Sequence, residues 1–335
     1  YELKRKRAGR RISKSTREYI LKRDNYECQY CGSQTRLEID HIFPYSRGGG
    51  NEPENLQVLF KSCNLAKGDS IPDIFKQKKE ILHINPKKIK LNIVYEDKDI
   101  LIINKPKGMV VHPGAGNYEN TLVNALLFKY KKNLSDINGS LRPGIVHRID
   151  KETTGLLVIA KNNFAHASLG NQFSDHKINR KYLCLSWGVI RPLNGQIISL
   201  ITRDKKNRQL MTVSDIRGKK AITNYKTIKV FNIKDIPKIS LIECELETGR
   251  THQIRVHLKY KGASLLGDKQ YGKKNIKFKK INSEFFDKLN KLSGQALHAK
   301  TLEFVHPTTK KWMNFNSDLP SSFKKILKLL ENLSD

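Results

Sequence analysis

The sequence has no run of about 18 apolar residues, the length that a membrane-spanning helix needs. Its N-terminal segment is basic and lacks the apolar stretch of a secretory signal. Cysteine is scarce as well: the five present are an odd number, which argues against a disulfide framework and for a reducing compartment. We therefore expect a cytoplasmic protein with no membrane partner.

Acidic residues are few compared with basic ones. Asp and Glu number 32 against 63 Lys and Arg, so the formal net charge is +31. This excess goes far beyond what solubility requires and indicates a polyanionic partner, for which nucleic acid is the usual candidate. The 335 residues, 38% of them hydrophobic, are enough for two domains with packed cores. A monomer is the simplest expectation.

Two segments are interpreted as connections rather than domains. Residues 1–23 form a basic arm with ten Lys and Arg against two acids. Such arms are usually solvated until they meet phosphate, so we expect disorder there. Residues 71–92 are rich in lysine, contain Pro72 and Pro86, and are predicted to be a linker.

Residues 24–70 have a different character, with several metal-ligand residue types close together. Cys28 and Cys31 have the CxxC spacing with which two thiolates hold one zinc ion. Asp40 and Asn64 offer oxygen ligands to a hard cation such as Mg²⁺. His41 is suited to deprotonate a water molecule that attacks a phosphodiester.

These residues and their spacing resemble the HNH endonuclease module, a small ββα-metal fold. The resemblance implies that His41 is the general base and that Asp40 and Asn64 bind the catalytic metal. It also implies that Asn55 orients His41.

The resemblance is incomplete at the zinc site. Zinc-binding members of that family usually close with a second CxxC pair, and here Phe60 stands in place of its first cysteine. Only Cys28, Cys31 and Cys63 remain as thiolate ligands. We therefore expect zinc binding to be weakened or absent, and cleavage activity to be weak or absent.

Residues 93–335 predict an α+β domain built on a mostly antiparallel sheet. Alternating or apolar runs predict strands at 93–95, 100–103, 181–185, 197–201, 221–230, 239–246 and 302–306. Helical periodicity predicts helices at 121–130, 164–173 and 321–333.

One carboxylate in this domain has basic neighbours on both sides. Asp150 lies among His147, Arg148 and Lys151, just before an apolar run at 156–160 that predicts a buried strand. A partly buried Asp needs a cationic partner to stay ionised, and an ionised Asp is a candidate nucleophile or base. From these residues alone, an ordinary surface ion pair is an equally good interpretation.

A second basic cluster begins at Gly249. Arg250, His252, Arg255 and His257 occupy a turn and the start of a helix, which predicts a clamp for phosphate or carboxylate.

Residues 93–335 resemble the RluA-type pseudouridine synthases, and within that family the branch that modifies large-subunit ribosomal RNA. The resemblance is carried by four blocks in the expected order, which are Asn104-Lys105-Pro106 with His112-Pro113, residues 147–155, Lys181-Tyr182 and residues 249–272.

The resemblance implies an isomerase that needs no cofactor and acts on RNA. Asp150 is then the nucleophile, attacking either the sugar or the uracil ring, and Arg250 is expected to pair with it. Tyr182 is expected to stack on the target base and help to remove its C5 proton. Arg148 is expected to fill the gap left by the extruded base, and further RNA contacts are expected from His147, Lys151, His252 and Arg255.

Other functions remain open at this stage. The HNH-like module could be a working nuclease, which would make the protein bifunctional. A basic RNA-binding assembly factor with a vestigial isomerase site is less well supported, because the expected catalytic residues are present. Two adjacent genes read as one chain would also give this sequence.

Overall fold

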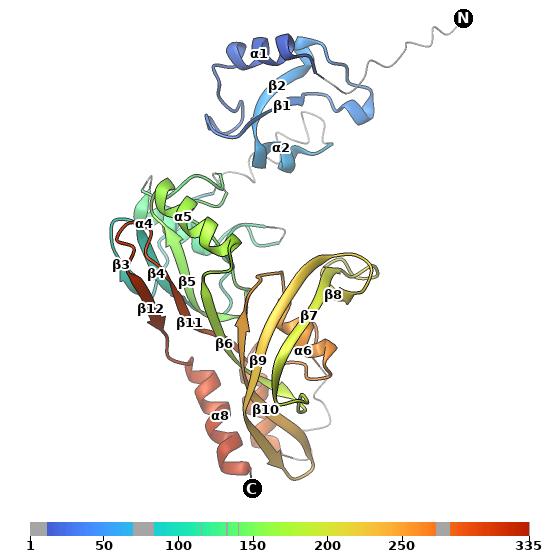
Figure 1. The fold of residues 1–335 in the computed structure, drawn as a ribbon, viewed down its shortest axis with the longest axis vertical. Helices are drawn as coiled ribbons and strands as arrows, with labels where there is room; N and C mark the ends of the chain where they lie inside the picture. The colour runs from blue at the N-terminus through green and yellow to red at the C-terminus, as the bar shows by residue number, and fades with distance from the viewer. Residues whose placement is uncertain are drawn as a thin grey trace, which may run out of the picture. The chain divides into compact units, whose positions relative to one another are not determined.

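A computed structural model describes residues 12–69, 84–114, 116–131, 133–139, 141–272 and 282–334 (Figure 1). The chain divides into two compact units, one of residues 1–88 with 112–144 and the other of residues 89–111 with 145–335. Residues 112–144, expected in the catalytic domain, thus group with the first unit. Residues 1–11 of the predicted basic arm and 71–83 of the predicted linker lie outside the described residues.

The first unit contains the expected ββα module. Strands β1 (Leu37–His41) and β2 (Leu56–Phe60) are antiparallel, with Leu37 opposite Phe60 and His41 opposite Leu56. Short 3-10 turns at Tyr45–Arg47 and Pro53–Asn55 lie in the connection, and helix α2 (Lys61–Lys67) follows β2 directly.

The expectation of disorder up to residue 23 is wrong from Lys14 onward. Helix α1 (Lys14–Arg23) begins after Ser13, whose hydroxyl accepts the Thr16 amide hydrogen at 3.0 Å. Ile20 is fully buried and packs with Leu56 and Val58 of β2. The helix is stable because the module covers its apolar face. The many charges on its other face hide this apolar face in the sequence.

Phe60 belongs to the core of this module. Its side chain is 2% exposed and packs with Cys28, Leu59 and Cys63. A buried phenyl ring therefore stands where the zinc-binding relatives have a thiolate, and apolar packing supplies stability that a zinc ion would otherwise give.

Replacing this ring should open the module. We expect Phe60→Ala to destabilise it by about 3–5 kcal/mol, the usual loss for a buried aromatic side chain. Hydrogen exchange of the β1 and β2 amides should accelerate in this variant. Leu65→Ala is the matched control, because Leu65 lies on α2 and is 76% exposed. Equal exchange rates in the two variants would contradict a core role for Phe60.

The predicted helix near residue 121 is also present in the first unit. Helix α4 (Leu122–Tyr130) is capped by Thr121, whose side chain and that of Asn124 each accept a hydrogen from the other residue's backbone amide. Asn124 also bonds the end of the linker, through Asn85 and Lys87.

The second unit is a ten-stranded mixed sheet, which confirms the α+β fold. Its strand order is β3-β4-β5-β11-β6-β10-β9-β7-β8, with β12 beside β11, and the strands of β5 and β11 form the parallel pair among antiparallel neighbours. The bounds are β3 Ile93–Glu96, β4 Ile100–Lys105, β5 Thr154–Ala160, β6 Asn179–Trp187, β7 Asn194–Arg203, β8 Met211–Ser214, β9 Lys219–Ile233, β10 Ile236–Leu246, β11 Leu297–Val305 and β12 Trp312–Asn316.

The described residues of this unit also form four helices: α5 Asn163–Ser174, α6 Gln253–Tyr260, α7 Ser283–Lys291 and α8 Ser321–Leu333. α7 and α8 supply Phe285, Phe323 and Ile326 to a core that includes Trp187 and Phe231 of the sheet. α7, β8 and β12 had no sequence prediction. Among the described residues, no helix is both long and apolar enough to cross a bilayer.

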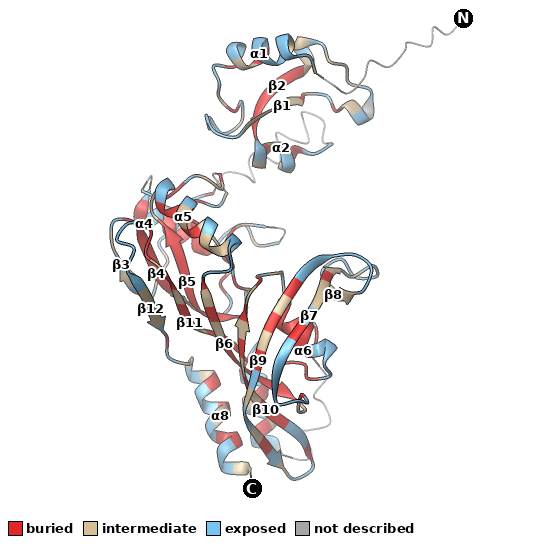
Figure 2. Ribbon diagram, viewed as in Figure 1, coloured by how far each residue is buried: buried red, intermediate tan, exposed pale blue. Residues whose placement is uncertain are grey.

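Every residue of β5 is buried (Figure 2). Gly155 near its start has a φ of +113°, and a Cβ there would lie 2.2 Å from the Ala299 carbonyl oxygen of β11. A side chain at this position would push the two strands apart, so the glycine fixes where the preceding loop, with Asp150, enters the sheet.

Candidate active site

A cavity of about 540 Å³ in the second unit collects most of the residues predicted for the isomerase site. They come from the loop before β5, from β6, and from the turn and helix after β10. The predicted residues in its lining are His147, Arg148, Asp150, Tyr182, Arg250, His252 and Arg255. Lys151 is not in the lining.

Asp150 pairs with Arg255, not with Arg250. Its Oδ2 accepts a hydrogen bond from Arg255 Nη1 at 3.0 Å. Arg255 is held from behind by Asp268, with Nε–Oδ2 at 2.7 Å and Nη2–Oδ1 at 2.9 Å, and by Gln270 Oε1 at 2.7 Å. The guanidinium therefore reaches the catalytic carboxylate in a fixed orientation.

The prediction that Arg250 pairs with Asp150 is therefore wrong. Arg250 lies in the turn before α6, and its Nε donates to the Lys220 carbonyl at 2.9 Å. Arg255 lies in the first turn of α6 and is 5% exposed. Both arginines are evident in the sequence, but which of them reaches Asp150 depends on where α6 begins, at Gln253.

The positive charge of Arg255 and the negative charges of Asp268 and Asp150 stabilise one another. Burial opposes the charged form, but the hydrogen bond to Asp268 and the charge of Asp150 outweigh it and raise the pKa of Arg255. Burial likewise raises the pKa of Asp268, but the hydrogen bond and charge of Arg255 reverse this, so its pKa is lowered. Both groups stay ionised, and Asp150 faces a permanent cation.

His252 approaches Asp150 from another side, with Nε2 4.0 Å from Oδ1. The Tyr271 hydroxyl accepts the Met211 amide hydrogen at 2.7 Å and lies 2.8 Å from His252 Nδ1. Since that hydroxyl is free to donate to Nδ1, we assign the ring hydrogen to Nε2, toward Asp150. Burial lowers the pKa of His252, although the charge of Asp150 acts in the other direction.

Tyr182 enters the cavity from β6 and is 6% exposed. Burial raises the pKa of its hydroxyl, so the neutral phenol is the resting form. The ring is fixed by a central strand, opposite Cys244 of β10 and Ala299 of β11.

His147 does not supply a positive charge, contrary to its interpretation as a basic neighbour of Asp150. Its Nε2 accepts the Val158 amide hydrogen at 3.1 Å, and its ring lies 4.7 Å from that of Phe173. Burial, and the charge of Arg180 after it, lower the pKa of His147 to about 3. This neutral ring ties the catalytic loop to β5.

Several site residues carried no sequence prediction. Lys105, fully buried at the end of β4, donates from Nζ to the carbonyl oxygens of Pro106, Met109 and Lys151 at 2.8, 2.8 and 3.0 Å. It thereby fixes the backbone next to Asp150, although burial lowers its pKa to about 7. Asp268 was named only within the block of residues 249–272, without the partner that gives it a role.

The two arginines should differ sharply on substitution. Arg255→Gln leaves Asp150 and buried Asp268 without their cation, so conversion of uridine should slow by about 10²–10³-fold. Arg250→Gln removes a contact to one backbone carbonyl and should slow it much less. Single-turnover conversion of substrate RNA, with folding checked by circular dichroism, measures both. A larger loss with Arg250→Gln would restore the pairing first expected from the sequence.

The HNH-like residues are not arranged as an open metal site. Asp40 Oδ2 lies 2.7 Å from Lys67 Nζ, and the Lys67 side chain is only 1% exposed. Asn64 Nδ2 donates to Glu38 Oε2 at 2.8 Å. A buried ammonium already neutralises Asp40, so these residues do not fit a divalent cation held between Asp40 and Asn64.

The expected role of Asn55 also needs correction. His41 Nε2 is bonded to Asn51 Oδ1 at 2.8 Å. Asn55 instead bridges the backbone of the loop, donating to the Phe43 and Gly50 carbonyls and accepting the Phe43 amide hydrogen. It therefore shapes the loop rather than orienting His41.

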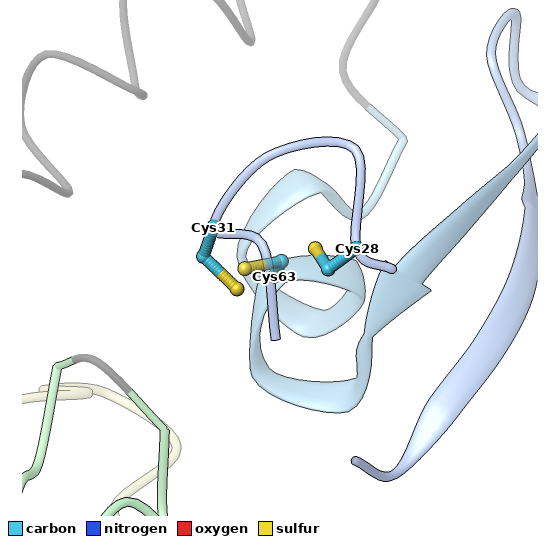
Figure 3. Close-up of side chains that lie close together, drawn as sticks. All are labelled: Cys28, Cys31 and Cys63. Carbon is cyan, nitrogen blue, oxygen red and sulfur yellow. The ribbon is translucent and has the colours of Figure 1, made fainter. Parts of the chain in front are cut away.

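The three cysteines of this module do come together (Figure 3). Their sulfur atoms lie within 4.8 Å of one another, with Cys28 and Cys63 buried and Cys31 exposed. Hydrogen bonds from Cys31 and Cys63 lower the pKa of Cys28 to about 2. Three donors of this kind suit a soft cation, and among the described residues no fourth cysteine or histidine joins them.

Two family models match separate parts of the chain. The family model described as RNA pseudouridylate synthase matches residues 99–260, and the one described as HNH endonuclease matches residues 28–70. A Zymomonas mobilis protein named ribosomal large subunit pseudouridine synthase D is 49% identical over 250 residues, covering 74% of this chain and 75% of its own. A Bacillus subtilis protein named as an uncharacterized RNA pseudouridine synthase is 46% identical over 255 residues, covering 76% of each chain.

A comparison with solved structures finds a similar fold. A solved structure titled Human RNA Pseudouridylate Synthase Domain Containing 4 has a TM-score of 0.55 and 25% identity, covering 72% of this chain and 93% of its own. The fold and cavity therefore define an RNA-modifying isomerase. The chain belongs to the RNA pseudouridylate synthase family, whose members convert uridine to pseudouridine, and this confirms the expected resemblance.

Proposed function

We propose that this protein isomerises uridine in large-subunit ribosomal RNA in the cytoplasm, with Asp150 as nucleophile. The observation that supports this most strongly is the 3.0 Å hydrogen bond from the buried guanidinium of Arg255 to the Asp150 carboxylate inside the cavity. The proposal of a ribosomal substrate is based on the name of the Zymomonas mobilis relative. The net charge of +31 suits such a polyanion.

Each residue of the cavity has a task in this reaction. Asp150 attacks the sugar or the ring, which lets the bond between C1′ and N1 break. Tyr182 stacks on the flipped base and helps to remove the C5 proton once C5 is bonded to C1′. Arg148 fills the space left by the base, and His252 directs an N–H toward Asp150.

No cofactor is part of this proposal. The isomerisation exchanges a bond at N1 for one at C5 and moves a proton from C5 to N1, so no oxidation state changes. The chain's own carboxylate supplies the covalent step. We also propose that the protein acts as a monomer.

Asp150→Asn should remove the nucleophile and keep the shape. Conversion of uridine by this variant should fall below detection, while RNA binding stays within about twofold because one neutral amide replaces one carboxylate of similar size. Tritium release from C5-labelled uridine measures the chemistry, and filter binding measures affinity. Turnover near the wild-type rate would show that Asp150 is not the nucleophile.

For the HNH-like module we propose nucleic-acid binding with weak or no cleavage. The buried Lys67 beside Asp40 supports this, since it stands where a nuclease needs its metal. We also propose that any zinc held by Cys28, Cys31 and Cys63 is a minor contributor, because Phe60 already fills the module's core. The alternative, a bifunctional enzyme, is favoured by the match of residues 28–70 to the HNH endonuclease family.

Cleavage assays separate the two functions. Plasmid nicking and RNA cleavage with Mg²⁺ or Mn²⁺ should show no activity that depends on His41, since the base lacks a metal-bound water to act with. His41→Ala is the control, and a zinc chelator should leave hydrogen exchange in the module unchanged. Metal-dependent cleavage that disappears in His41→Ala would establish the bifunctional alternative.

A further inference from the structure

Arg180 is a buried cation with no acidic partner. It lies on β6, is 7% exposed, and forms no ion pair with any carboxylate in the part of the chain that the structure describes. Its Nη2 donates to the carbonyl oxygens of Leu246 and Glu247 at 3.2 and 3.3 Å, and its Nε has no hydrogen-bond partner. The Glu247 carboxylate is turned away and accepts hydrogens from Gln196 and Asn224.

Such a charge is unfavourable for folding. An arginine stays protonated when buried, so the lost hydration has to be recovered from its neighbours. The Phe173 ring, 5.2 Å from the guanidinium carbon, and two backbone carbonyls recover part of it. Burial still lowers the pKa of Arg180, whereas the neighbouring charges raise that of Arg255. Residues that oppose stability in this way are typical of functional sites.

Arg180 faces the reaction. It lines the same cavity as Asp150 and Tyr182. Alternate residues of a strand share a face, so Arg180 and Tyr182 point the same way, while Lys181 points to the other side and lies 3.9 Å from Glu245. A Cβ at Gly249 would lie 2.8 Å from Arg180 Nη1, so the glycine leaves room for the guanidinium.

The reaction creates a negative charge close to this place. If Asp150 attacks the sugar, the C1′–N1 bond breaks and its electron pair goes onto the expelled uracil ring. If Asp150 attacks the ring, the electron pair of the ring's double bond moves onto the carbonyl oxygen. In the sugar route C5 then attacks C1′, and the bond between C1′ and Asp150 breaks. In the ring route the C1′–N1 bond breaks, C5 joins C1′, and the bond from Asp150 to the ring breaks. In both routes the ring is anionic before C5 joins C1′, and loss of the C5 proton with protonation of N1 completes the product.

We propose that Arg180 is a catalytic residue whose buried, unpaired charge stabilises this anionic uracil ring. The inference rests on the proposed roles of Asp150 and Tyr182. A fixed cation in a site that excludes water stabilises a developing anion more than it stabilises the neutral base, and so it lowers the barrier. An RNA phosphate would be an alternative anion, but Arg180 shares its strand face with the residue that stacks on the base.

The test uses three variants of the full chain. Arg180→Gln removes the charge, Arg180→Lys keeps it, and Lys181→Gln removes one charge from the opposite face of the same strand. Single-turnover conversion at saturating RNA should fall by about 10²–10³-fold in Arg180→Gln. It should recover in large part in Arg180→Lys and stay near wild type in Lys181→Gln.

Two further readouts separate a chemical role from a structural one. The melting temperature of Arg180→Gln should be no lower than that of wild type, because a buried unpaired charge is lost. RNA that carries 5-fluorouridine at the target position has no C5 proton to lose, so breakage of its C1′–N1 bond is measured instead. The loss of this step in Arg180→Gln should be smaller than with uridine, because fluorine withdraws electrons and stabilises the anionic ring itself.

Three results would overturn the inference. Weaker RNA binding with a smaller salt dependence and an unchanged saturating rate would assign Arg180 to a phosphate. Equal losses in Arg180→Gln and Arg180→Lys, with lower melting temperatures, would assign it to anchoring β10. Wild-type activity in Arg180→Gln would leave it no role. A wild-type protein that makes no pseudouridine would instead refute the proposed function, and Asp150→Asn supplies the inactive reference.

Discussion

The ion pair between Arg255 and Asp268 is the interaction on which the catalytic site depends. Asp268 is almost fully buried, receives two backbone amides from Gln270 and Tyr271, and binds two nitrogens of Arg255. An isolated charge of either sign is unfavourable at this depth, whereas this pair is well hydrogen-bonded. The remaining nitrogen of Arg255 donates to Asp150, so a contact that stabilises the fold also places a cation beside the proposed nucleophile.

The loop that carries Asp150 is held from several directions by buried polar contacts. Lys105 holds its backbone, Gln295 donates to Thr153, and the Thr154 hydroxyl is 2.8 Å from His298 Nδ1. These contacts join β4, β5 and β11. The three strands meet at Gly155, which is paired with Lys105 of β4 and with Ala299 of β11. A nucleophile positioned in this way needs little reorganisation when the base arrives, which is a condition for efficient electrostatic catalysis.

Much of this structure could be predicted from the sequence because periodicity and spacing are local properties. The apolar run after Gly155 predicted the buried β5, the Thr121 cap predicted α4, and the HNH-like spacing predicted the ββα module. Side-chain partners could not be predicted, since they depend on which elements pack together. Arg255, and not Arg250, reaches Asp150 because it lies on the inward face of α6. The Lys67 ammonium comes next to Asp40 only when α2 packs on β1.

The central claim is that this chain makes pseudouridine in large-subunit ribosomal RNA. The most direct measurement is a nucleotide-resolution pseudouridine map of ribosomal RNA from cells with and without the gene, and from deleted cells that again carry the wild-type gene. The account predicts that one or a few uridines of the large subunit lose their modification on deletion and regain it on complementation. A map that is unchanged by deletion would contradict it.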